Sequence, residues 1–147
     1  MGLHHVGVTV SDLDRSLRFY RDLLGLAVLH RGVDQGAWID DVVGIDGTVI
    51  AVADLDAGDG RILELVEYRS PRESAAITRC SQPGTLHVAI AVESVPATLA
   101  RIEAAGGAAI SRRPVTLALP GSTWDGATVA YTRDPDGAIV ELIELEA

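Results

Sequence analysis

The sequence contains no lysine and no asparagine, and its only cysteine is Cys80. Without lysine, no side-chain amine can form a Schiff base with a carbonyl substrate. Without asparagine, no N-glycosylation site exists. A single cysteine excludes an internal disulfide, which agrees with a reducing compartment, and the position of Cys80 in a polar linker favours an ordinary thiol over a nucleophile.

Positive charge is also scarce. Twelve arginines stand against 21 acidic residues, which gives a formal net charge of -9 at pH 7. Nucleic-acid binding needs a basic footprint, so this class is excluded. Charges break the apolar runs well before the roughly 18 residues of a membrane span, and the first residues lack the regions of a signal peptide. These absences predict a cytoplasmic protein that acts on a small molecule.

What the chain does have is an internal repeat. Its 147 residues, 48% of them hydrophobic, are typical of one folded domain, and the richness in Ala, Arg, Asp and Gly suggests a bacterial source. Residues 5–10 match residues 87–92, and residues 61–67 match residues 138–144. The sequence therefore predicts one compact domain made of a first module, residues 1–68, a linker, residues 69–84, and a second module, residues 85–147.

Each module is expected to have the order βαβββ. In the first module a strand is followed by a helix over residues 13–24, capped by Ser11 or Asp12 and ended by Gly25. In the second module Ser94 caps a helix through residue 105. Further strands are expected at residues 27–31, 48–53, 61–68, 108–112, 127–132 and 138–145, with long loops at residues 32–44 and 114–125.

His5 and His87 occupy equivalent positions on the first strand of each module, which in the first module is expected at residues 3–10. Because side chains alternate between the faces of a strand, each histidine shares its face with small residues, which leaves room for a ligand. These small residues are Gly7, Thr9, Ala89 and Ala91. His4 is expected to face the helix side, and His30 has no counterpart in the second module, so both are set aside as ligands.

Glu64 and Glu141 also occupy equivalent positions, within apolar strands. A carboxylate in such surroundings carries a large desolvation cost unless it is paired or binds a metal. Two imidazoles and two carboxylates would suit one divalent ion of Zn, Ni, Co, Mn or Fe, with open positions for substrate. Glu67 and Glu144 recur as well, but their odd spacing directs them to the other face, where structural carboxylates are expected.

Four motifs together resemble the vicinal oxygen chelate superfamily, and the resemblance covers nearly the whole chain. They are HVGV at residues 5–8, FYRDLLG at 19–25, RDPDG at 133–137 and VEL at 140–142. The resemblance implies an α+β fold in which two βαβββ modules form an open, barrel-like mixed sheet around a metal. It places the ligands on the first and last strand of each module, which implies His5, Glu64, His87 and Glu141.

The superfamily includes glyoxalase, methylmalonyl-CoA epimerase, extradiol dioxygenases, fosfomycin-modifying enzymes and metal-free antibiotic-binding proteins, so the fold alone does not choose a reaction. By resemblance, four ligands favour a glyoxalase-like lyase or isomerase (an epimerase). It would form a metal-stabilised enolate from a small carbonyl or acyl substrate, with Glu141 or Glu64 carrying the proton. The alternatives are an Fe(II) ring-cleaving dioxygenase, in which Glu64 need not touch the metal, and a metal-free protein that sequesters an antibiotic such as bleomycin.

The substrate pocket is expected to draw on both modules and their long loops. Its candidate residues are Thr9, Trp38, Ala89, Arg112 and Trp124. The arginine could hold an anionic group of the substrate. The modules could pair within one chain or between two chains, and a homodimer is expected.

Overall fold

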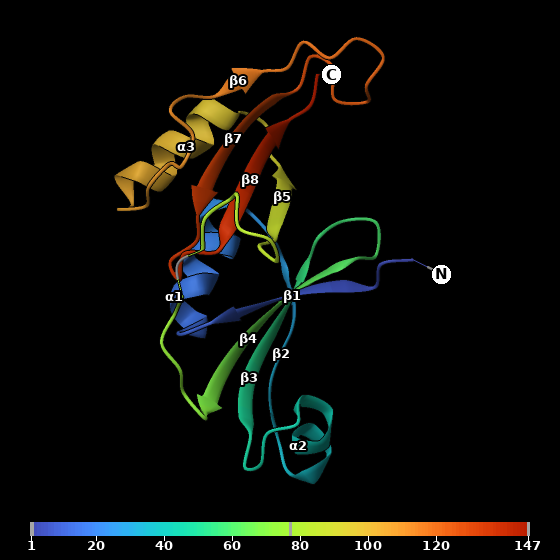
Figure 1. Cartoon of the computed structure of the whole chain (residues 1–147), viewed down its shortest axis with the longest axis vertical. Coiled ribbons are helices and arrows are strands. Elements are labelled where there is room, and N and C mark those ends of the chain that lie inside the picture. The colour runs from blue at the N-terminus through green and yellow to red at the C-terminus, as the bar shows by residue number, and fades with distance from the viewer. Residues whose placement is uncertain (1, 77, 147) are drawn as a thin grey trace. The chain divides into compact units, whose positions relative to one another are not determined.

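The computed structural model describes residues 2–76 and 78–146. The chain divides into two compact units, Met1–Ala76 and Ile77–Ala147. Each unit contains one four-stranded sheet with both parallel and antiparallel pairs (Figure 1). This arrangement confirms the predicted α+β class with mixed strand pairing, and each unit has a sheet of its own.

The sheet of the first unit has the strand order β1-β4-β3-β2. Its elements are β1 (His5–Val10), α1 (Leu13–Leu17), the π-helix η1 (Arg18–Leu23), β2 (Val28–Gln35), α2 (Ala37–Val43), β3 (Val49–Asp56) and β4 (Ile62–Ser70). The first and last strands lie side by side and run parallel, whereas the other pairs are antiparallel. α1 packs against β3 and β4.

The second unit repeats this arrangement with the strand order β5-β8-β7-β6. Its elements are β5 (His87–Ala91), α3 (Val95–Ala104), β6 (Val115–Thr116), β7 (Thr128–Arg133) and β8 (Ile139–Glu144). Again the first and last strands are parallel neighbours. α3 packs against β7 and β8, so the repeat seen in the sequence is also a repeat of topology.

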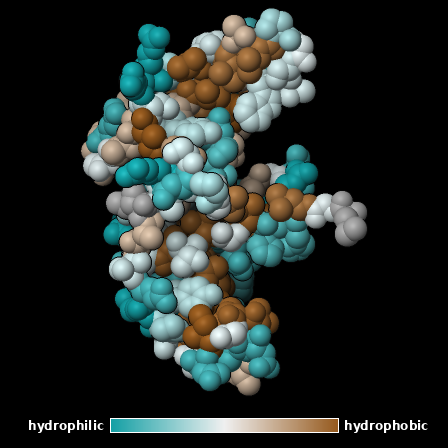
Figure 2. Space-filling model, viewed as in Figure 1, coloured by the Kyte–Doolittle hydropathy of each residue, from teal (hydrophilic) through white to brown (hydrophobic). Residues whose placement is uncertain are grey.

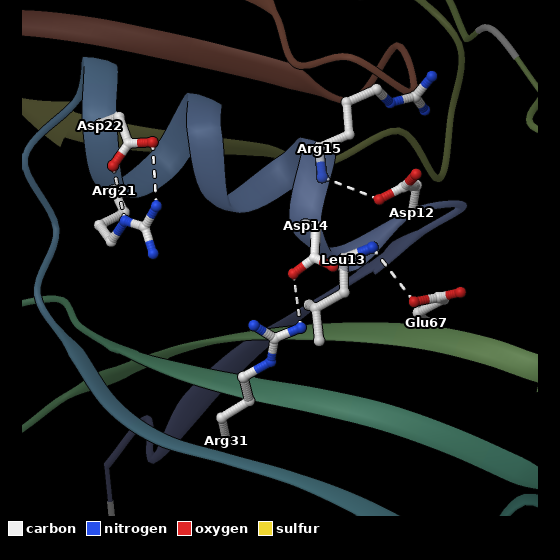
Figure 3. Close-up of polar contacts among 8 residues, drawn as sticks. All are labelled: Asp12, Leu13, Asp14, Arg15, Arg21, Asp22, Arg31 and Glu67. Atoms are coloured by element: carbon white, nitrogen blue, oxygen red, sulfur yellow. Dashed lines mark hydrogen bonds and ion pairs between the residues drawn. The ribbon is translucent and has the colours of Figure 1, made fainter.

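The predicted helix over residues 13–24 forms as α1 followed by η1. Asp12 is its N-cap, because its side chain accepts a hydrogen bond from the Arg15 N–H at 2.9 Å (Figure 3). The wider turn of η1 is visible where the Leu24 N–H donates to the Phe19 carbonyl, five residues earlier, at 3.1 Å. Gly25 then adopts a φ of 84°, a left-handed conformation that favours glycine and ends the helix.

A glutamate from the last strand of each unit holds the start of that unit's helix. Glu67 accepts a hydrogen bond from the Leu13 N–H at 3.2 Å (Figure 3), and Glu144 accepts one from the Val95 N–H at 2.8 Å. Carboxylates are favourable at helix N-termini, where N–H groups lack partners within the helix. The prediction that both glutamates are structural is thus confirmed.

Removing the Glu67 carboxylate should destabilise the first unit. We expect Glu67→Ala to lower the free energy of unfolding by about 1–3 kcal/mol, because the buried Leu13 N–H loses its acceptor and Arg72 loses an ion pair. Glu67→Gln keeps one carbonyl acceptor and should be less destabilising. Urea denaturation of the two variants measures the difference, and equal losses would contradict this role.

Two sequence predictions of local structure were wrong. Residues 32–44 are not a loop, because β2 continues to Gln35 and α2 follows, with Ile39 packed on Ile50 and Val52. Residues 108–112 do not form a strand. They form only an isolated bridge, between Ala109 and Thr132, and the Ser111 side-chain oxygen accepts the Tyr131 N–H at 2.8 Å, so this N–H is not available for regular strand pairing.

The second predicted loop, residues 114–125, contains the two-residue strand β6 and otherwise consists of turns and irregular backbone. In the part of the chain that the structure describes, no helix has the length and apolar character to cross a membrane.

Candidate metal centre

The first predicted ligand pair is brought together by the parallel pairing of β1 with β4. Gly7 is the register partner of Glu64, and His5 lies two residues before Gly7 on the same face. His5 Nε2 lies 3.9 Å from Glu64 Oε2. A Cβ at Gly7 would lie 3.5 Å from the same oxygen, at ordinary van der Waals distance, so Gly7 lies directly beside this carboxylate.

The second pair forms in the same way between β5 and β8. Ala89 is the register partner of Glu141, and His87 Nε2 lies 3.2 Å from Glu141 Oε2. The two pairs differ in exposure, since the Glu141 side chain is 5% exposed and that of Glu64 is 33% exposed. The second pair is therefore the shorter and the more deeply buried one.

The surroundings of Glu141 Oε2 indicate whether a metal would fit beside it. This oxygen is buried and makes no hydrogen bond within the described residues, despite its proximity to His87. A buried carboxylate oxygen without a partner is destabilising, and a cation would satisfy it. Two donors that each lie about 2.0–2.2 Å from one metal as neighbouring ligands are roughly 3.0–3.5 Å apart. The 3.2 Å separation in the second pair fits this requirement.

The structure shows two pairs and not a complete site. Among residues 2–76 and 78–146, no group of three or more His, Cys, Asp or Glu side chains is arranged to hold a metal. Each unit by itself supplies one imidazole and one carboxylate. The four-ligand set therefore remains a prediction.

Tyr131 is a site residue that the sequence analysis missed. It is the register partner of Glu141 in β7, and its ring centroid lies 5.2 Å from that of His87. Burial, followed by the negative charge of Glu141, raises the pKa of the Tyr131 phenol, which favours its protonated form. The equivalent residue of the first unit is Asp54, the register partner of Glu64. The strand register was needed to find both.

The orientation predicted for His4 was wrong. His4 was expected to face the helix side, but its Nδ1 lies 3.0 Å from His5 Nδ1, and the two rings are nearly perpendicular. The reason is that β1 begins at His5, so strand alternation does not govern the residue before it. His30 is exposed in β2, as expected.

The five predicted pocket residues lie on five different elements or segments. Thr9 and Ala89 are exposed on the strands that carry His5 and His87, β1 and β5. Trp38 is exposed in α2, Trp124 is exposed in a turn, and Arg112 is exposed before β6. Their contact with a substrate remains a prediction.

A buried apolar cluster lies on the same face of the first sheet as Glu64. Val66 lies two residues after Glu64 in β4 and so shares its face of the sheet. Together with Tyr68 it packs against a buried cluster of Ile39, Ile50 and Val52, which α2 covers. Hydrophobic surface extends over α2 in Figure 2. The first unit thus places Glu64 and this apolar cluster on one face of its sheet.

Comparisons with known proteins agree with this architecture. Residues 2–142 match the profile of the Glyoxalase/Bleomycin resistance protein/Dioxygenase superfamily. The chain is 31% identical, over its full length and 81% of the relative, to a 2-epi-5-epi-valiolone epimerase from Actinomyces sp.. It is 29% identical, over 95% of its length and 88% of the relative, to a probable lactoylglutathione lyase from Vibrio parahaemolyticus.

A solved structure shows the same fold. A glyoxalase family protein from Bacillus cereus superimposes with a TM-score of 0.82 at 22% identity, covering 98% of this chain and 94% of that one. The chain therefore belongs to the Glyoxalase/Bleomycin resistance protein/Dioxygenase superfamily. Its relatives are named as an epimerase and as lyases, which supports a glyoxalase-like enzyme of the isomerase or lyase type.

Proposed function

We propose that this protein is a divalent-metal-dependent isomerase or lyase that forms an enolate from a small carbonyl or acyl substrate. The observation that carries the proposal is the buried Oε2 of Glu141, which lies 3.2 Å from His87 Nε2 and makes no hydrogen bond among the described residues. A nitrogen and an oxygen donor at this separation suit a metal ion. The names of the relatives support the reaction class.

The metal would be held by His5, Glu64, His87 and Glu141, with the two pairs coming from one chain or from two chains of a homodimer. Imidazole and carboxylate donors suit Zn, Ni, Co, Mn or Fe. When bound, the ion supplies Lewis acidity that stabilises the negative charge of the enolate.

Glu141 is the proposed proton carrier. A ligand carboxylate that leaves the metal transiently can take a proton from the carbon next to the substrate carbonyl and later return it. Return of that proton to the other face of the same carbon gives epimerisation, and its return to the neighbouring carbon gives the isomerisation expected of a glyoxalase. Glu64 is its counterpart in the first unit and the alternative carrier.

Solvent deuterium exchange tests this function. Apo protein is loaded separately with each of the five metals and incubated in D2O with 2-epi-5-epi-valiolone or with S-lactoylglutathione. We expect metal-dependent incorporation of deuterium next to the carbonyl of one of these compounds, measured by NMR. Apo protein with the same substrate is the control.

Two other outcomes would replace the proposal. Oxygen uptake with a catechol, only in the Fe(II) form, would indicate a ring-cleaving dioxygenase. Failure to bind any metal, together with tight binding of bleomycin by the apo protein, would indicate antibiotic sequestration. Exchange that is equally fast in the apo protein would contradict metal dependence.

A further inference from the structure

The imidazoles of His4 and His5 are close enough to share a hydrogen bond. Their Nδ1 atoms lie 3.0 Å apart, and the rings meet edge to face. A neutral imidazole has one nitrogen that donates and one that accepts, so this contact requires one ring to carry its proton on Nδ1. If His5 is the donor, its Nε2 is left with a free lone pair, and Nε2 is the atom that faces Glu64.

The second unit has no such contact at the equivalent position. Leu86 precedes His87 there, and it is 80% exposed. His87 is instead held between the Tyr131 ring at 5.2 Å and the buried carboxylate of Glu141 at 3.2 Å. Within the described chain, only the first unit has a hydrogen bond between this histidine and the residue that precedes it.

The side chains of the first pair lose conformational freedom when a metal binds. The side chains of His5 and Glu64 are 48% and 33% exposed, and their nearest polar atoms are 3.9 Å apart. Exposed side chains sample several rotamers, and ordering them on metal binding has an entropic cost. A hydrogen bond to His5 Nδ1 restricts rotation of the ring and selects its tautomer before a metal arrives.

We propose that His4 is a positioning residue that accepts the Nδ1–H of His5 and so directs the unprotonated Nε2 of His5 toward Glu64. This inference rests on the proposed metal-dependent function, because it assigns His5 Nε2 as a ligand. Partners of this kind orient ligand histidines and typically change metal affinity by about 10–100-fold when they are removed. The role is specific to the first ligand pair.

The tautomer of His5 tests the proposal without any metal. In apo protein at pH 8, histidines are in general largely neutral, and long-range 1H–15N NMR distinguishes a proton on Nδ1 from one on Nε2. We expect His5 to carry its proton on Nδ1 in the parent and to shift toward Nε2 in His4→Leu. A parent His5 protonated on Nε2, or an unchanged tautomer in His4→Leu, would overturn the proposal.

Metal affinity provides the second measurement. His4→Leu places in the first unit the residue type that the second unit has, and Leu86→Ala is the matched control, one residue before the other ligand histidine. Zn(II) affinity is measured by competition with a chelator, and the absorption spectrum of the Co(II) form reports the ligand field. We expect a 10–100-fold loss in His4→Leu, recovery in part by His4→Gln, whose amide oxygen can accept the same proton, and less than a twofold change in Leu86→Ala.

The outcomes separate the two proposals. If the parent protein binds no metal but shows the expected tautomer change, the proposed function fails and the hydrogen bond stands. If the parent binds metal and His4→Leu binds it equally well with an unchanged Co(II) spectrum, the role of His4 is contradicted and the metal centre stands. A loss of the same size in Leu86→Ala would also contradict it, because the effect would then not be specific to the first unit.

Discussion

Replacing both His5 and His87 by alanine is expected to abolish metal binding. Each substitution removes the nitrogen donor from one pair, which leaves two carboxylates without any imidazole. Carboxylates alone hold Zn, Ni or Co far more weakly than a mixed nitrogen and oxygen set does. Elemental analysis of protein purified without chelators or a His-tag should give about one metal per site in the parent and none in the double variant.

The two single variants, His5→Ala and His87→Ala, compare how much each pair contributes to metal affinity. His87→Ala should lose more affinity than His5→Ala, because the pair of His87 and Glu141 is shorter and more buried. His30→Ala is the control, since this histidine is exposed and was not predicted to be a ligand. A double variant that keeps its full metal content would show that the ion is bound elsewhere, and metal loss in His30→Ala would place this residue in the site.

Replacing Glu141 by glutamine should abolish deuterium exchange and yet stabilise the apo protein. Exchange is lost because an amide cannot take the substrate proton. The free energy of unfolding of the apo protein rises because the buried carboxylate has an oxygen without a hydrogen bond among the described residues, and a neutral amide is less costly to bury. We expect a gain of about 1 kcal/mol, or roughly 2–4 °C in Tm, for a chain of this size.

Calorimetry of the apo forms at pH 8, followed by exchange assays of the metal-loaded forms, measures both effects. Glu64→Gln is the matched control, because its carboxylate is more exposed and its replacement should change Tm little. A lower Tm for Glu141→Gln would indicate a structural role for this carboxylate. Full retention of exchange would contradict its role as the proton carrier.

The sequence indicated which histidines and glutamates would lie together, because these residues recur at equivalent positions of the repeat. His5 and His87 recur with the same neighbours, as do Glu64 and Glu141, and a parallel register in each unit brings each histidine close to its glutamate. Helix starts were predictable for a similar reason. Asp12 caps α1 through a local hydrogen bond that depends on only a few neighbouring residues.

Other features depended on contacts that the sequence does not display. The proximity of Tyr131 to His87 and Glu141 depends on the strand register, and His4 meets His5 because β1 starts at His5 and not at Leu3 as predicted. α2 was missed because residues 32–44 mix charged and apolar residues without a dominant period, and packing of Ile39 on the sheet stabilises the helix. The Ser111 side chain accepts the Tyr131 N–H, which is then not available to the strand predicted at residues 108–112.

The pairing of the first strand with the last strand also governs when each ligand pair can form during protein synthesis. His5 leaves the ribosome early, but it cannot meet Glu64 until β4, the final strand of the first unit, has emerged and docked beside β1. Pairing over such a sequence separation is slow compared with the formation of local helices. Under the proposed ligand set, a nascent chain that has completed only its first unit offers an ion His5 and Glu64, and Glu141 becomes available only after β8 is translated.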